Sequence, residues 1–260
     1  MIPKNLKATY VVVVVSMLVT ASCNENSSPL TVVQGTHSST TKSVANGRIA
    51  SYSFDGTEGD PIDLTVAHRW IANYVTKNNN LHTAHFFGNR FLLKTLSQPG
   101  SMGIRFYYSI SDSGNNHLLA VPATGDGNDF SVVYQASGLN SPVDLAYSGS
   151  QFVFTGAEAD SLSSETAKHL IDNYKVSNAS GVEAHFFGHE IIRQILSENN
   201  CVGIRCYYAL NDAGVQQLLL VGVSSTGVNI LPSQSIGGRV TDNGTIADVS
   251  SPCPTYCSGK

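Results

Sequence analysis

The sequence predicts an α+β fold made of two tandem copies of a small unit, each with helices packed on an antiparallel sheet that ends in a hairpin. Residues 51–130 align with residues 151–230 without a gap, and 27 of the 80 aligned positions are identical. A spacing of 100 residues is too long for a solenoid repeat and fits a duplicated small domain. We expect the copies to span 48–135 and 136–235, as two packed lobes or as two halves of one pseudo-symmetric domain.

The first elements of each copy are predicted to be a short strand and an amphipathic helix. The strand stretches, 48–54 and 150–154, each end in phenylalanine. The apolar residues of the helix recur at i, i+3, i+4 and i+7 and therefore share one face: Ala67, Trp70, Ile71 and Tyr74 in the first copy, and Ala167, Leu170, Ile171 and Tyr174 in the second. Ser163 and Ser164 are candidate N-caps of the second helix.

The pentapeptide Ala-His-Phe-Phe-Gly follows in both copies, at Ala84–Gly88 and at Ala184–Gly188. Its glycine comes directly before a second helical pattern, over 89–96 and 189–196. We therefore expect the pentapeptide to join a strand to a helix.

A hairpin is predicted to complete each copy. Stretches 103–110 and 203–210 alternate as strands, and Gly114 and Gly214 supply the turn. The strands that follow are apolar on both faces and are expected to be central. Residues 131–135 form either an extra strand or part of a linker.

The first 22 residues have the layout of a secretory signal: Lys4 and Lys7, an apolar run too short for a comfortable membrane span, then small residues. The segment ends in Thr-Ala-Ser-Cys and resembles a bacterial lipoprotein signal, although Thr20 stands where Leu or Val is usual. The resemblance makes Cys23 the lipidated first residue of the mature chain. Ordinary cleavage near Ala21–Ser22, giving a secreted or periplasmic soluble protein, is the alternative.

The duplicated part resembles uncharacterised lipoproteins of Gram-negative bacteria. This resemblance implies a membrane anchor at Cys23, on the outer membrane of the envelope. Residues 23–47, rich in Ser, Thr and Asn, are expected to be a flexible tether. The net charge of −4 becomes 13 − 19 = −6 once Met1–Ser22 is removed with its two lysines. With no basic block in the sequence, we expect no nucleic-acid partner.

Histidines are the first candidates for chemistry. His85 and His185 stand in the shared pentapeptide, where they are either core residues or ligand-binding groups. The second copy adds His189 and Glu190, and these two with His185 are candidates for a hydrolytic site. Because Gly188 is expected to separate a strand from a helix, the two histidines do not share a helix, and no metal site is expected.

Arginine and tyrosine on the strand after the second helix form a sharper pair. Ile104, Phe106 and Tyr108 are expected on the core face, which places Arg105 and Tyr107 on the other. Arg205 and Tyr207 repeat this pattern in the second copy. Such a pair binds carboxylate, phosphate or sugar. Alternatively, the arginine packs its stem on tyrosine, or forms an ion pair with an acid such as Glu58, Asp60, Glu158 or Asp160.

Two further groups are weaker signals. Residues 125–129 (GDGND) carry two aspartates and are expected to be a plain turn rather than a calcium loop. The cysteines other than Cys23 lie in or after the second copy and are disulfide candidates: Cys201, Cys206, Cys253 and Cys257. The last two belong to a tail predicted over 236–260, and Cys206 also fits a buried thiol.

The sequence is compatible with three functions, and no cofactor is expected because nucleotide-binding and hydrolase motifs are missing. The first is an exported, lipid-anchored binding or interaction module for a glycan, peptidoglycan or an envelope protein, using Arg105, Tyr107, Arg205 and Tyr207, with His85 and His185 as lesser candidates. The second is a hydrolase with its site at His185, His189 and Glu190. The third is a purely structural envelope protein.

Overall fold

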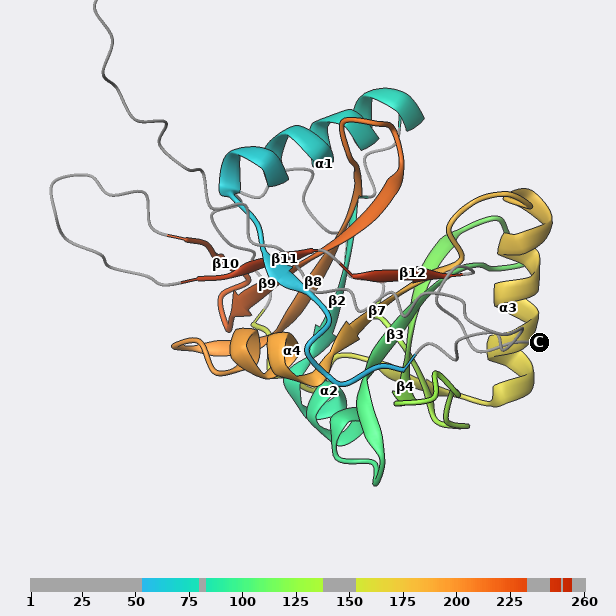
Figure 1. The fold of residues 1–260 in the computed structure, drawn as a ribbon, viewed down its shortest axis with the longest axis horizontal. Coiled ribbons are helices and arrows are strands. Elements are labelled where there is room, and N and C mark those ends of the chain that lie inside the picture. Colours follow the sequence, from blue (N-terminus) through green and yellow to red (C-terminus); the bar gives the residue numbers. More distant parts are fainter. Residues whose placement is uncertain (1–52, 80–82, 138–152, 233–243, 249, 254–260) are drawn as a thin grey trace, which may run out of the picture. The chain divides into compact units, whose positions relative to one another are not determined.

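Two six-stranded antiparallel sheets and four helices make up the described part of the chain (Figure 1). The computed structural model describes residues 53–79, 83–137, 153–232, 244–248 and 250–253. The signal segment, the tether, Cys23, Cys257 and much of the tail over 236–260 lie outside these residues. No helix in the described part is long and apolar enough to cross a bilayer.

The first sheet, sheet A, has the strand order β1 (Asp60–Pro61), β11 (Ile246–Asp248), β9 (Gln216–Ser224), β8 (Cys201–Leu210) and β2 (Ala84–Gly88), with β10 (Asn229–Ile230) also paired to β9. The second sheet, sheet B, has the order β12 (Ser251–Cys253), β7 (Ala184–Gly188), β3 (Ser101–Ile110), β4 (Asn116–Thr124), β5 (Val133–Gln135) and β6 (Asp160–Leu162). The helices are α1 (Leu64–Asn78), α2 (Asn89–Leu96), α3 (Ser164–Ser177) and α4 (His189–Leu196). The predicted α+β class is therefore confirmed.

The two copies exchange their pentapeptide strands. Strand β2 of the first copy pairs with β8 of the second, and β7 of the second copy pairs with β3 of the first. In register, Phe86 lies opposite Arg205 and Phe186 lies opposite Arg105. Each sheet therefore contains strands from both copies, and the limits of the sheets do not follow the limits of the sequence repeat.

The main core lies between the sheets and also draws on both copies. Phe106 and Tyr108 of β3 belong to the same buried cluster as Cys206 and Tyr208 of β8, and the rings of Tyr108 and Tyr208 are 5.4 Å apart. Helices α2 and α4 each contact β3 and β8. Separate apolar clusters join α1 to the outer face of sheet A and α3 to the outer face of sheet B. The strand faces that carry Arg105 and Arg205 are thus covered by helices.

The glycine of each pentapeptide allows close approach of a loop from the other copy. The Gly88 amide donates to the Glu158 carbonyl and the Gly188 amide to the Glu58 carbonyl, each over 2.7 Å. A Cβ added at Gly88 would collide with the backbone of Gly156, and one at Gly188 would collide with that of Gly56. These contacts explain why glycine occupies both positions.

Most predicted elements are confirmed, including the strand-to-helix join at the pentapeptide, the hairpins, the extra strand β5 and the central position of β4 and β9. Ser163 is the N-cap of α3, where its side chain accepts a hydrogen bond from the Thr166 amide. The expected strands ending at Phe54 and Phe154 are wrong over the described residues 53–54 and 153–154, which are irregular. There the Phe54 amide donates to the carbonyl of Gly125 and the Phe154 amide to that of Ser225.

Candidate ligand-binding cavity

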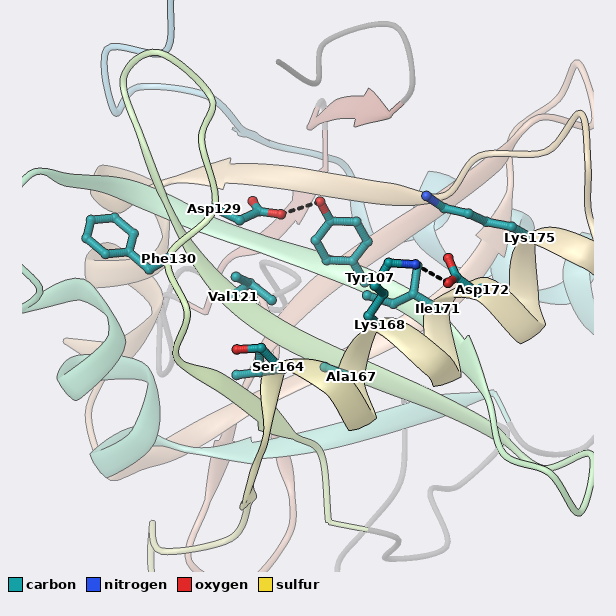
Figure 2. A pocket seen from close by; sticks show the side chains of 11 residues that line it. Tyr107, Val121, Asp129, Phe130, Ser164, Ala167, Lys168, Ile171, Asp172 and Lys175 are labelled. Carbon is teal, nitrogen blue, oxygen red and sulfur yellow. Dashed lines mark hydrogen bonds and ion pairs between the residues drawn. The ribbon is translucent and has the colours of Figure 1, made fainter. Parts of the chain in front are cut away.

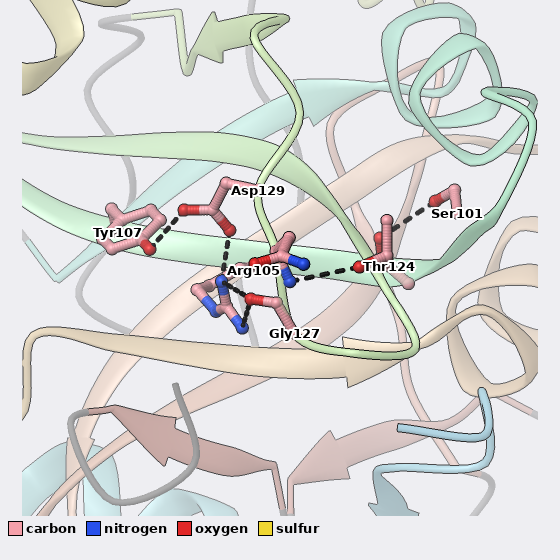
Figure 3. Close-up of polar contacts among 8 residues, drawn as sticks. Ser101, Arg105, Tyr107, Thr124, Gly127 and Asp129 are labelled. Atoms are coloured by element: carbon pink, nitrogen blue, oxygen red, sulfur yellow. Dashed lines mark hydrogen bonds and ion pairs between the residues drawn. The ribbon is translucent and has the colours of Figure 1, made fainter. Parts of the chain in front are cut away.

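Arg105 anchors a polar network on the outer face of sheet B (Figure 3). Its guanidinium forms an ion pair with Asp129 and donates from both Nη atoms to the Gly127 carbonyl over 3.1 Å. The aromatic rings of Phe54 and Phe186 lie 5.7 and 6.0 Å from the guanidinium carbon. Only 1 % of Arg105 is exposed, so it cannot contact a ligand directly.

Tyr107 completes this network at the surface. Its hydroxyl donates to Oδ2 of Asp129 over 2.5 Å, while Arg105 binds Oδ1 of the same carboxylate. The Asp129 side chain is 35 % exposed, so its carboxylate is open to solvent on one side. Burial raises the pKa of Asp129, which the positive charge of Arg105 opposes. Burial also raises the pKa of Tyr107 well above its usual range, so the phenol remains a hydrogen-bond donor.

A cavity of about 540 Å³ lies between α3, the outer face of sheet B and the segment that joins β4 to β5 (Figure 2). We call it the α3 cavity. Its apolar wall consists of Val121, Phe130, Val133, Ala167 and Ile171. Its polar groups come from Tyr107, Asp129, Ser164, Lys168, Asp172 and Lys175. Its volume lies in the range typical of small-molecule sites.

The corresponding region over sheet A is closed. Tyr207, the counterpart of Tyr107, is 0 % exposed, and its hydroxyl accepts a hydrogen bond from Nδ2 of Asn229 over 2.8 Å. Asn229 replaces Asp129 and accepts from Arg205, which is 2 % exposed. Ile246 of β11 belongs to the apolar cluster against α1, together with the partly buried Leu64 and Val75.

The helix residues account for much of the difference between the two regions. At positions 100 residues apart, Ser164 of α3 corresponds to Leu64 of α1, and Lys175 corresponds to Val75. Leu64 and Val75 pack in the apolar cluster over sheet A, whereas Ser164 and Lys175 line the α3 cavity. The two copies therefore carry the same strand motif under helix surfaces of different polarity.

The four predicted binding residues are only partly accessible. Arg105, Arg205 and Tyr207 are buried, and Arg105 is ion-paired, as in the alternative in which the arginine serves packing. Tyr107 lines the cavity. The partner of Arg105 is Asp129, which the sequence did not identify because residues 125–129 are predicted to be a plain turn. The turn itself is present, since the Gly127 amide donates to Thr124. The sequence does contain a signal for Asp129: the matching residue of the second copy is Asn229, so both copies place a side-chain oxygen at this position.

The histidine candidates do not line the α3 cavity. His185 is fully buried on β7, and its Nδ1 lies 2.7 Å from the Ser250 hydroxyl. Burial lowers its pKa to about 3, so the ring is neutral near pH 7. His189 begins α4 and contacts the Met102 carbonyl through Nδ1, whereas Glu190 is exposed in the first turn. His85 is partly buried and packs its ring against Tyr208.

The cysteines and the acidic residues supply no further centre within the described residues. Cys201 and Cys206 are free thiols, and Cys206 lies fully buried in the main core. Cys253 is buried on β12 and is not among the free thiols. No group of three or more His, Cys, Asp or Glu side chains placed to hold a metal ion occurs in the part of the chain that the structure describes.

Comparison with known proteins finds no family model, no curated protein and no solved structure that matches this chain.

Proposed function

We propose that this protein is an exported, lipid-anchored envelope protein that binds a small molecule in the α3 cavity. The observation that carries the proposal is the difference between the two sheets. The same Arg-Tyr strand motif lies under a cavity of about 540 Å³ with polar groups on sheet B, and under a sealed apolar cluster on sheet A. Packing alone would be served by sealing both regions, as in most protein interiors.

The lipid anchor follows from the resemblance of the first 23 residues to a lipoprotein signal. Replacing Cys23→Ser in the producing cell is expected to move the protein from the membrane fraction to the soluble fraction and to abolish incorporation of a fatty-acid label. Continued labelling of the variant would reject the anchor at Cys23. An unlabelled wild-type chain recovered in the soluble fraction would favour ordinary cleavage near Ala21–Ser22.

The binding function is tested by closing the α3 cavity with residues that the chain already uses elsewhere. The double variant Ser164→Leu with Lys175→Val gives α3 the residues found at the matching positions of α1, so it is expected to fold. Wild type is screened by thermal shift against metals, sugars, amino acids and peptidoglycan fragments, since a bound ligand raises the melting temperature.

A ligand of the cavity is expected to stabilise the wild type and to lose its effect on the double variant. Val176→Thr is the control, because Val176 is 85 % exposed on α3 and does not line the cavity. If every compound that stabilises the wild type also stabilises the double variant, the cavity is not the binding site. If no compound acts on either, the purely structural function is favoured.

A further inference from the structure

The charged groups around the α3 cavity are all paired within the protein. Asp129 pairs with Arg105, Lys168 pairs with Asp172, and Lys175 lies 2.8 Å from Glu183. Together these six side chains have no net formal charge. A charged ligand would either break one of these pairs or leave its own charge without a partner. The cost is high at the Arg105–Asp129 pair, where Arg105 is buried, and small at the exposed Lys168–Asp172 pair. The charge balance favours a neutral ligand.

One corner of the cavity presents hydrogen-bond acceptors. The Tyr107 hydroxyl donates to Asp129, and the Arg105 side chain also lies within hydrogen-bonding reach of the Tyr107 oxygen, which leaves one lone pair of that oxygen for another donor. The carboxylate of Asp129 is held from behind by Arg105 and remains 35 % exposed, and each of its oxygens can accept a further bond. Two adjacent acceptors held in a fixed orientation suit a ligand with neighbouring hydroxyl groups.

The cavity wall offers apolar contacts in addition to these hydrogen-bond acceptors. Ile171 offers aliphatic surface and Phe130 an aromatic ring, both partly exposed, while Val121 and Ala167 are buried behind them. A pyranose sugar is neutral, has hydroxyls around its edge and has C–H groups on its faces, so it matches both the acceptor corner and this wall. The volume of about 540 Å³ has room for a mono- or disaccharide.

We propose that the α3 cavity binds a neutral carbohydrate, with its hydroxyls on Asp129 and Tyr107 and an apolar ring face on Phe130 and Ile171. This inference rests on the proposed binding function and specifies its ligand. The sealed counterpart over sheet A does not take part, because Tyr207 is 0 % exposed and already bonded to Asn229.

The test is isothermal titration calorimetry of the full chain with glucose, galactose, mannose, N-acetylglucosamine, cellobiose and lactose. Glucuronate and glucosamine serve as charged comparisons. At least one neutral sugar is expected to bind at least tenfold more tightly than its charged analogue. Tyr107→Phe and Asp129→Asn are each expected to weaken that binding at least tenfold. Asn229→Asp, in the sealed region, is the matched control and is expected to leave the affinity unchanged.

Circular dichroism shows whether each variant is folded, and Tyr107→Phe keeps the test valid if Asp129→Asn is unstable. The carbohydrate inference is overturned if no neutral sugar binds, or if the affinity does not respond to Tyr107→Phe. It is also overturned if charged compounds bind as well as neutral ones. If charged compounds alone bind and Ser164→Leu with Lys175→Val abolishes their binding, the binding function stands and only the ligand class is wrong. If that double variant changes no binding at all, the proposed function fails as well.

Discussion

Tyr107 and Asp129 are joined by a hydrogen bond of 2.5 Å that has no acidic equivalent in the second copy, where Asn229 bonds Tyr207. The difference is one of charge rather than of shape, because aspartate and asparagine are nearly isosteric. Arg105 is almost fully buried in the first copy, and Arg205 is almost fully buried in the second. A buried guanidinium is therefore held by a carboxylate in one sheet and by an amide in the other.

Replacing Asp129→Ala is expected to lower the free energy of unfolding by about 2 kcal/mol, because Arg105 would lose the carboxylate that pairs with it. The value is below that of a fully buried pair, since Asp129 is partly exposed. Asp129→Asn is expected to cost about 1 kcal/mol, since an amide already serves this role for Arg205. Urea denaturation measures both losses, provided that the dependence of the unfolding free energy on urea concentration is unchanged. No loss for Asp129→Asn would show that the charge of Asp129 does not matter, whereas equal losses for the two variants would show that the charge carries the whole effect.

Replacing Gly88→Ala or Gly188→Ala is expected to lower the free energy of unfolding by about 3 kcal/mol, because the new Cβ would collide with the loop of the other copy. Gly114→Ala is the control: it has a φ of +82° but open space around its Cβ, so a loss of about 1 kcal/mol is expected. The melting temperatures of the three variants rank their losses of stability. If Gly88→Ala is no worse than Gly114→Ala, the contact between the copies is not tight.

Local elements were predictable because their signals are local. Alternation along 103–110 correctly placed Phe106 and Tyr108 on the core face, and helical spacing correctly grouped Ala67, Ile71 and Tyr74. The exchange of β2 and β7 could not be predicted in the same way. The pentapeptide is identical in both copies, and so is the Gly-Ile-Arg segment of its partner strand. Neither strand can therefore favour its own copy by side-chain complementarity along these segments.

The candidate site was predicted only in part for a related reason. Tyr107 could be identified from alternation, but one of the two rings that cover Arg105, Phe186, comes from the other copy, so the burial of Arg105 could not be predicted from its own strand. Ser164 and Lys175 line the cavity. From the periodicity of α3 they could be predicted only to lie on the polar surface of the helix, not to face a cavity. Strands β11 and β12 were also missed, because residues 246–253 read as part of a tail and gain their structure by pairing with distant strands.

His185 is expected to make the fold less stable as the pH falls. Burial lowers its pKa from 6.5 to about 3 in the folded state, so below pH 6.5 the unfolded chain takes up a proton that the folded chain does not. By pH 5 this difference removes about 2 kcal/mol of stability relative to pH 7.5. His185→Phe keeps the ring next to Tyr108 and removes the titration. Chemical denaturation at both pH values is expected to show a smaller acid loss in the variant, and an equal loss would contradict this role.

Glu198 is expected to make the fold less stable as the pH rises. One of its carboxylate oxygens accepts a hydrogen bond of 2.6 Å from the Thr245 amide, and the other is buried with no partner among the described residues. Burial raises its pKa from 4.5 to about 7, so between these pH values the folded chain binds the proton more tightly than the unfolded chain. Stability is then lost as the pH rises from 4.5 through 7.

Glu198→Gln keeps an oxygen that can accept from the Thr245 amide and removes the charge. Glutamine is also the residue at the matching position of the first copy, Gln98. We expect the variant to be more stable than wild type by about 1 kcal/mol at pH 8, a value reduced because Glu198 is partly exposed. At pH 4 the two proteins are expected to be equally stable. Melting temperatures at both pH values measure the difference. A variant that is less stable than wild type at pH 8 would mean that the Glu198 carboxylate is stabilising in its ionised form.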